Sequence, residues 1–355
     1  MHKKLALFPM TRDMCAVARY ASLLVGYSLH KLFIPPFSNY NGSDINVIDG
    51  GDATGLLLEK YADNDLNTCD VLFVDYDENI KTTDIYTDVI NKAEKMGKEI
   101  IISKKLKQKL SMKYSSDEKQ VVMKINPETD RLYEVKIPVI TVLTQGIRTD
   151  QYATELALRA HFINSGYRVS QIGSYCASLL FGFNGLPDFI YENRDSYEKI
   201  LLFNRYVHEI INNENPDILI MGVPDAIMKY NNQILNGMGL VPYVVCNAVN
   251  SDLSVLCTYY GKYTKQYFEE TSQFGNFCHN TPIELFNIAN TAFAPEMIDE
   301  VPKLKFIEVN SNFVMETIDE ISADAFVLFN ALNEGSIKNA CKTINDMLTS
   351  NVCIM

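Results

Sequence analysis

Short apolar runs alternate with amphipathic, helix-like segments along the whole chain, and this alternation limits its fold more than any other feature. Runs such as Asp70–Asp75 and Glu99–Ser103 are apolar at nearly every inner position instead of at every second one. Strands have this pattern when helices cover both faces of their sheet. Strands that alternate with helices build β-α-β units around a mainly parallel sheet. The sequence therefore predicts an α/β protein.

The length of 355 residues exceeds the usual size of one compact core, so we expect two domains. Gln120–Ile125 and Arg131–Lys136 flank a turn-like segment and predict a β-hairpin that closes the first domain. We place the boundary near residue 136, with one Rossmann-like domain over residues 1–136 and another over 137–355. The boundary has no flexible linker rich in Gly and Ser, so we expect the halves to pack against each other.

Composition excludes several classes of function. The net charge of −12 and the pI near 5.0 oppose a nucleic-acid partner, because phosphate binding depends on Lys and Arg. No stretch approaches the roughly 18 to 20 apolar residues of a membrane span. The N-terminus leads directly into a strand-like run, so we expect no export, no membrane partner and a cytoplasmic location.

The second half of the chain predicts its own series of strands and helices. We expect strands at Ile137–Leu143, Asp217–Met221 and Pro242–Ala248, and a helix over Tyr152–Asn164. Asp195 with Glu198 has the spacing of a capping box, which predicts the start of another helix. Further strands are expected at Ser254–Tyr259, Phe306–Val309 and Ala325–Phe329, before a last helix.

The loop after Ile137–Leu143 is the first place to look for a ligand, because loop N–H groups and a helix N-terminus can converge on an anion. A working phosphate loop is Gly-x-x-x-x-Gly-Lys followed by Ser or Thr, with its lysine on the terminal phosphates and its hydroxyl on magnesium. Here Asp150 would repel a phosphate, and Gln151 and Tyr152 replace the lysine and the hydroxyl residue.

The sequence therefore predicts a domain that is like the phosphate-loop NTPases in outline but has a degenerate loop. We interpret the loop as a β-α turn that binds no nucleotide, and the alternative is a remodelled anion or peptide site. The candidate ligand-binding residues of this loop are Thr144, Gly146, Arg148, Thr149 and Gln151.

A second expected element is an apolar strand that ends in a metal-binding carboxylate. Asp217–Met221 supplies the strand, but Gly222 occupies its end. Asp225 is the nearest carboxylate and could face a ligand at the carboxyl edge of the sheet, where open α/β folds bind theirs. A carboxylate that stabilises the turn is the favoured interpretation. Gly222 and Asp225 complete the candidate site, and no residue can be assigned a catalytic role.

Several runs in this order resemble a clostridial-type family called peptide maturation system proteins. The runs are Pro138–Leu143, Glu155–Arg159, Gly166–Ser174, Phe181–Phe183, Lys199–Asn204 and Gly222–Pro224, with a weaker match at Val47–Gly51. The resemblance is strongest over residues 137–260. It implies a layout similar to phosphate-loop proteins and a role as an accessory protein encoded with small, bacteriocin-like peptides and their modifying enzymes. The family often has a glycine after the proline of the turn, where this chain has Asp225.

Three functions compete. The leading hypothesis is an accessory protein for peptide modification that hydrolyses no nucleotide, requires no cofactor and binds the precursor peptide or a modifying enzyme. The alternative is an ATP-dependent ligase or kinase that uses ATP and magnesium, which Arg148 and Thr149 leave open. A third is a regulator that binds a small molecule.

The eight cysteines include no Cys-x-x-Cys pair, so we predict that all are reduced and that none binds metal. Thiol titration of the denatured protein without reductant should find eight free thiols. Metal analysis of the purified protein should find no stoichiometric zinc or iron, and a stoichiometric metal would contradict the prediction.

Overall fold

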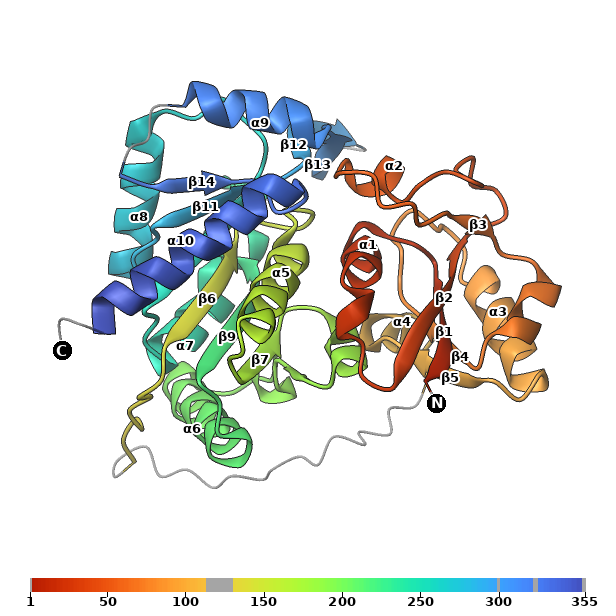
Figure 1. Cartoon of the computed structure of the whole chain (residues 1–355), viewed down its shortest axis with the longest axis horizontal. Coiled ribbons are helices and arrows are strands. Elements are labelled where there is room, and N and C mark those ends of the chain that lie inside the picture. Colours follow the sequence, from red (N-terminus) through yellow and green to blue (C-terminus); the bar gives the residue numbers. More distant parts are fainter. Residues whose placement is uncertain (1, 113–129, 299–300, 322–324, 353–355) are drawn as a thin grey trace. The chain divides into compact units, whose positions relative to one another are not determined.

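The structure is a computed structural model that describes residues 2–112, 130–298, 301–321 and 325–352 (Figure 1). The chain forms two compact units. The first comprises Met1–Asp49, Ala53–Val122 and Cys176–Gly182, and the second comprises Gly50–Asp52, Met123–Tyr175 and Phe183–Met355. Each half of the chain therefore contributes one short segment to the unit that the other half builds.

The first unit is a five-stranded parallel sheet with helices, in the strand order β3-β2-β1-β4-β5. This order reverses direction at β1, as in dinucleotide-binding folds. Its elements are β1 (Lys3–Phe8), α1 (Arg12–Arg19), β2 (Tyr27–Ile34), α2 (Asn46–Asp49), β3 (Glu59–Lys60), β4 (Val71–Val74), α3 (Asp84–Lys95), β5 (Glu99–Ile102) and α4 (Lys104–Lys109).

The second unit contains a seven-stranded parallel sheet in the order β14-β11-β10-β6-β9-β7-β8, with a separate antiparallel hairpin, β12–β13. Its strands are β6 (Val139–Thr144), β7 (Val169–Gly173), β8 (Asn184–Gly185), β9 (Ile218–Ala226), β10 (Leu253–Thr258), β11 (Leu285–Ile288), β12 (Thr291–Ile298), β13 (Val301–Glu308) and β14 (Val327–Phe329). Its helices are α5 (Gln151–Asn164), α6 (Ser196–Glu214), α7 (Leu240–Ala248), α8 (Lys265–His279), α9 (Ser311–Glu320) and α10 (Glu334–Val352).

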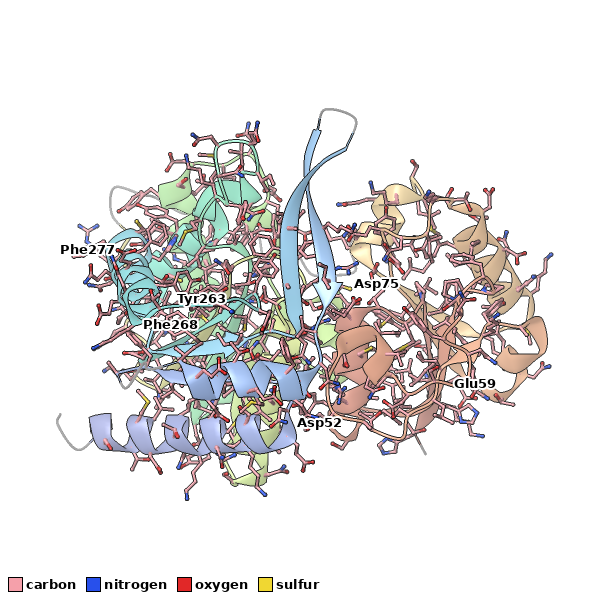
Figure 2. The ribbon with its side chains drawn as sticks, turned by 90° about the horizontal axis from the view of Figure 1, so that it is seen from above. Asp52, Glu59, Asp75, Tyr263, Phe268 and Phe277 are labelled. Atoms are coloured by element: carbon pink, nitrogen blue, oxygen red, sulfur yellow. The ribbon has the colours of Figure 1, made fainter. Side chains whose placement is uncertain are left out.

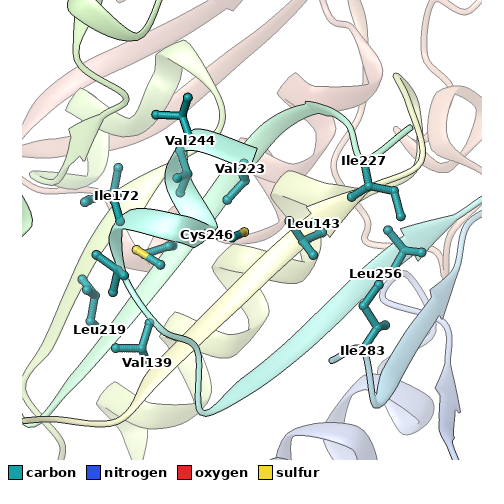
Figure 3. Packing of buried hydrophobic residues seen from close by; sticks show 14 of the residues in the cluster. Val139, Leu143, Ile172, Leu219, Val223, Ile227, Val244, Cys246, Leu256 and Ile283 are labelled. Atoms are coloured by element: carbon teal, nitrogen blue, oxygen red, sulfur yellow. The ribbon is translucent and has the colours of Figure 1, made fainter. Parts of the chain in front are cut away.

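Helices cover both faces of this sheet. On one face α5 packs on β6, β7 and β9 and against α10, and on the other α6 packs against α7, which contacts β9 and α8. Figure 3 shows the core on the α7 side, where Val139, Leu219 and Val244 are among the buried residues. Every residue of β6 is buried. The expected α/β class with two mainly parallel sheets is thus confirmed.

Some local expectations are wrong. Pro242–Ala248 lies in helix α7 instead of a strand, because an apolar run of this length fits a buried strand and a buried helix equally well. Gln120–Ile125, the first strand of the expected hairpin, lies outside the described residues, and Arg131–Lys136 has no regular secondary structure. Phe306–Val309 belongs mostly to β13, so it pairs in the antiparallel hairpin and adds no strand to the parallel sheet.

The segment Gly50–Asp52 is built into the second unit where α9 and α10 begin (Figure 2). The Asp52 carboxylate accepts hydrogen bonds from Ser311 Oγ and from the Glu334 backbone N–H, both at 2.9 Å. Gly50 has a φ of +72°, and a Cβ there would lie 2.3 Å from the Val309 carbonyl oxygen. The glycine is therefore required by close backbone approach, while Asp52 satisfies a free N–H at the start of α10.

His279, at the end of α8, is buried, and its Nε2 lies 2.8 Å from the Ile227 carbonyl oxygen, to which it can donate. Burial lowers the pKa of His279 below its ordinary 6.5. The unfolded chain therefore binds the proton more readily than the folded one, and the free energy of unfolding should fall as the pH drops below the unfolded pKa of about 6.5.

We predict that His279→Gln, which keeps a donor for Ile227 but does not ionise, reduces this pH dependence. Urea unfolding of both proteins between pH 7.5 and 5.5 measures it. Equal slopes in the two proteins would show that His279 does not contribute.

Candidate functional site

The carboxyl edge of the seven-stranded sheet has a topological switch point. From β6 the chain runs through α5 towards β7, and from the adjacent β10 it runs through α8 to β11 on the other side. Open α/β sheets bind their ligands outside the strand ends at such a point. The loop after β6 lies along this edge, whereas Asp225, expected beyond the end of its strand, is the second-last residue of β9.

The loop after β6 is held by its own hydroxyl groups. Thr144 Oγ1 accepts from the Gly146 N–H at 3.0 Å and lies 2.6 Å from Thr149 Oγ1. Thr149 Oγ1 donates to the Gly146 carbonyl at 3.1 Å. Both threonines are buried. The structure therefore brings together three predicted site residues, but their polar groups bond to one another.

Gln151, which the sequence analysis aligned with the lysine of a phosphate loop, connects two strands. Its Nε2 donates to the carbonyl oxygens of Val142 on β6 and Val223 on β9, both at 2.8 Å. The ladder between these strands shifts register between Val142 and Thr144, next to the carbonyl groups that the amide satisfies. A buried carbonyl without a partner is costly, so this side chain stabilises the sheet.

Arg148 has a φ of +63° and interacts with the hairpin. Its guanidinium lies 5.2 Å from the ring centroid of Phe306 and 3.5 Å from a carboxylate oxygen of Glu308, both on β13. The Arg148 side chain, which the sequence analysis proposed as a ligand for an anion, thus already contacts an aromatic ring and a carboxylate.

Asparagines at the ends of β11 and β14 complete the network, and sequence reasoning did not find them. Asn287 Nδ2 donates to the Thr149 carbonyl, and the Asn290 N–H donates to the Asp150 carboxylate, both at 3.0 Å. Asn330 Nδ2 donates to Asn290 Oδ1 at 2.7 Å. The available signal was that Asn287 and Asn330 each follow an apolar Leu-Phe pair. Such an apolar pair indicates where a strand ends, but it does not indicate which residue the following asparagine will contact.

Tyr259, directly after β10, packs against the loop at the switch point. Its hydroxyl donates to the Ile147 carbonyl at 2.9 Å, and a Cβ on Gly146 would lie 2.3 Å from the same oxygen. The ring contacts Phe293 on β12, with centroids 4.5 Å apart. Burial raises the pKa of Tyr259, against the opposing charge of Arg148. Gly146 is therefore glycine because a tyrosine of this protein lies against it.

β9 was expected to end at Met221 but continues to Ala226, and its middle receives a carboxylate from a helix. A Cβ on Gly222 would lie 2.2 Å from the carboxyl carbon of Glu155, on α5. The Glu155 carboxylate is fully buried and accepts hydrogen bonds from Ser174 Oγ, from the Ser174 N–H at 3.2 Å and from Gln171 Nε2 at 3.3 Å. Gly222 is therefore inside the strand, and its lack of a side chain leaves the space that the Glu155 carboxylate of α5 occupies.

Asp225 lies farther along β9 with a φ of +66°, and its side chain is exposed, although partial desolvation raises the pKa of its carboxyl group. The nearest turn is at Gly237, where a Cβ would lie 3.6 Å from Asp225 Cβ. No described contact joins Asp225 to the loop after β6. In the described part of the chain, no three His, Cys, Asp or Glu side chains are grouped so that they could hold a metal ion.

The chain matches no model of a known protein family and no curated protein at a significant level. Among solved structures it is similar to a DUF1611 family protein from Anabaena variabilis, with a TM-score of 0.55, 11% identity, and coverage of 81% of this chain and 88% of that one. A pseudomurein peptide ligase type C from Methanothermus fervidus has a TM-score of 0.27 and 11% identity over 95% of this chain and 70% of that one. The first likeness supports the α/β fold alone, and the second is too low to carry an argument.

We predict that Gly222→Ala lowers the free energy of unfolding by about 1 to 3 kcal/mol, because its methyl group overlaps the Glu155 carboxylate. Adding Glu155→Ala should relieve the overlap, so the double variant should be less destabilised than the sum of the single ones. Urea unfolding of the four proteins measures the coupling. Strict additivity would show that the two residues are not in contact.

Proposed function

We propose that this chain is an accessory protein in the maturation of a ribosomally made peptide, and that it binds the precursor peptide or a modifying enzyme without hydrolysing nucleotide. The observation that carries this proposal is the loop after β6. Gln151 bonds to Val142 and Val223, Arg148 lies on Phe306, and Tyr259 packs over Gly146. Phosphoryl transfer depends on positioned cations and metal ions.

The resemblance to peptide maturation system proteins supplies the biosynthetic setting. It rests on sequence runs that are strongest over residues 137–260 and include the Gly222–Pro224 turn of β9. In the described residues no helix has both the length and the apolar character of a membrane span. A cytoplasmic location remains a prediction that agrees with this setting.

An ATP-dependent ligase or kinase is the second candidate, and the buried Glu155 carboxylate beside Gly222 of β9 favours it. A phosphate-loop enzyme directs a carboxylate of a neighbouring strand towards its magnesium ion. The replaced lysine and hydroxyl weigh against this candidate. Each such loss should cost roughly 3 to 4 kcal/mol of transition-state stabilisation, by comparison with the loss of one oxyanion donor.

We predict no steady-state phosphate release from ATP and magnesium. Turnover above about 1 per second that disappears in Arg148→Gln would place the chain among NTPases and favour the second candidate. Arg148 is the appropriate variant because it is the sole cation among residues 144–151.

The accessory role predicts that a small precursor peptide is encoded beside the gene of this chain, and it is tested with that peptide. Fluorescence anisotropy of the labelled peptide should show saturable binding, and a scrambled peptide of the same composition is the control. Equal binding of the two peptides would contradict the accessory role. Binding of neither peptide, whether or not the modifying enzyme is present, would contradict it as well.

A further inference from the structure

A row of exposed apolar side chains crosses the turn before α7 and the first turns of that helix. The row comprises Leu235, Met238, Leu240 and Tyr243, which are 47, 58, 64 and 45% exposed. Leu240 and Tyr243 are three residues apart on α7 and therefore lie on one side of it. Contiguous exposed apolar side chains, unlike single ones, mark interaction sites. We call these four residues the apolar row.

The backbone holds the apolar row in a conformation that L-residues avoid. Asn236, Gly237, Met238 and Gly239 have successive φ values of +46, +67, +57 and +74°. A left-handed conformation costs roughly 1 to 2 kcal/mol at a non-glycine residue such as Met238. The turn is fixed by close packing, since a Cβ on Gly239 would lie 2.3 Å from the Ile227 carbonyl oxygen. Strain of this kind persists at sites where the surrounding structure imposes it, which are often functional sites.

A carboxylate borders the apolar row. Asp225 Cβ is 3.6 Å from the position of a Cβ on Gly237, within the turn. The pKa of the half-exposed Tyr191 is raised by partial desolvation and by the negative charges of Asp225 and Asp188. Lys229, in the preceding loop, donates to Asn232 Oδ1 at 2.7 Å. Asp225 is thus the charged side chain that the structure places against the turn, in a chain with a net charge of −12.

We propose that the apolar row and Asp225 form the surface that binds the precursor peptide, through an apolar peptide segment that carries a lysine or arginine. This rests on the proposed function. Charge complementarity selects this occupant. An anionic membrane would be repelled by the Asp225 carboxylate, and a second copy in a symmetric contact would bring the two Asp225 carboxylates together.

The probe is a fluorescein-labelled amphipathic peptide of leucine and lysine, with two companions in which glutamate replaces lysine or serine replaces leucine. The leucine and lysine peptide should bind best. Leu240→Ser with Tyr243→Ser should weaken its binding about tenfold or more, because two apolar contacts are lost. Asp225→Asn, which tolerates the positive φ, should weaken it about threefold and reduce its dependence on salt.

Leu57→Ser is the matched control, because Leu57 is a 55% exposed leucine of the first unit. The affinity of this variant for the leucine and lysine peptide should equal that of the wild type. All variants alter exposed side chains, and thermal midpoints check that they fold. The proposal would be overturned if the glutamate peptide bound as tightly as the leucine and lysine peptide, or if the Leu240→Ser, Tyr243→Ser variant bound the peptide as the wild type does. It would also be overturned if the wild type self-associated and this variant did not.

The gene-encoded precursor separates this proposal from the proposed function. If the precursor binds the wild type and the Leu240→Ser, Tyr243→Ser variant equally, the proposed binding surface is wrong and the accessory role stands. If the precursor fails to bind while the leucine and lysine peptide binds as expected, the accessory role is wrong and the surface stands.

Discussion

The arrangement of the second unit depends on one constraint, which is that buried polar groups at the carboxyl edge of its sheet need hydrogen-bond partners. β6 is buried along its whole length, so the loop that follows it begins inside the protein. Thr144, Thr149, Gln151 and Asp150 all meet this need through bonds to the protein itself. These polar groups of the loop are therefore already engaged within the protein. The same constraint therefore determines both the stability of this edge and the kind of function proposed for it.

The sequence predicts the parts of the fold that local patterns encode. Continuous apolar runs indicated the parallel sheets, and Asp195 was expected to begin a helix, where its carboxylate accepts from the N–H groups of Tyr197 and Glu198. Pro242–Ala248 was mistaken for a strand because its apolar run has no clear period. The contacts of the site were not predictable in this way. Asn287 and Asn290 meet the loop after β6 across 138 and 140 residues of sequence, and no local pattern contains that distance.

Two glycines show how a deviation from a motif can hide its replacement. Gly222 looked like a lost carboxylate, yet the structure places the Glu155 carboxylate in the space that a side chain there would need. Gly146 was a candidate ligand-binding residue, yet the Tyr259 hydroxyl lies in the space that a side chain there would need. In both cases the sequence indicates that space is needed, and only the three-dimensional structure shows which group fills it.

The predicted domain boundary near residue 136 remains a prediction, because each compact unit includes a short segment from the other half of the chain.

The place of Asp52 has a consequence for the order of events during synthesis. Its partners Ser311 and Glu334 are 259 and 282 residues further along the chain. At usual rates of translation the ribosome needs roughly 15 to 55 s to add the longer of these stretches. Throughout that interval Asp52 has been made but has no helix start to cap. The second unit therefore cannot complete its fold until the ribosome has added Glu334, and a nascent chain that stalls earlier would leave this edge unfinished.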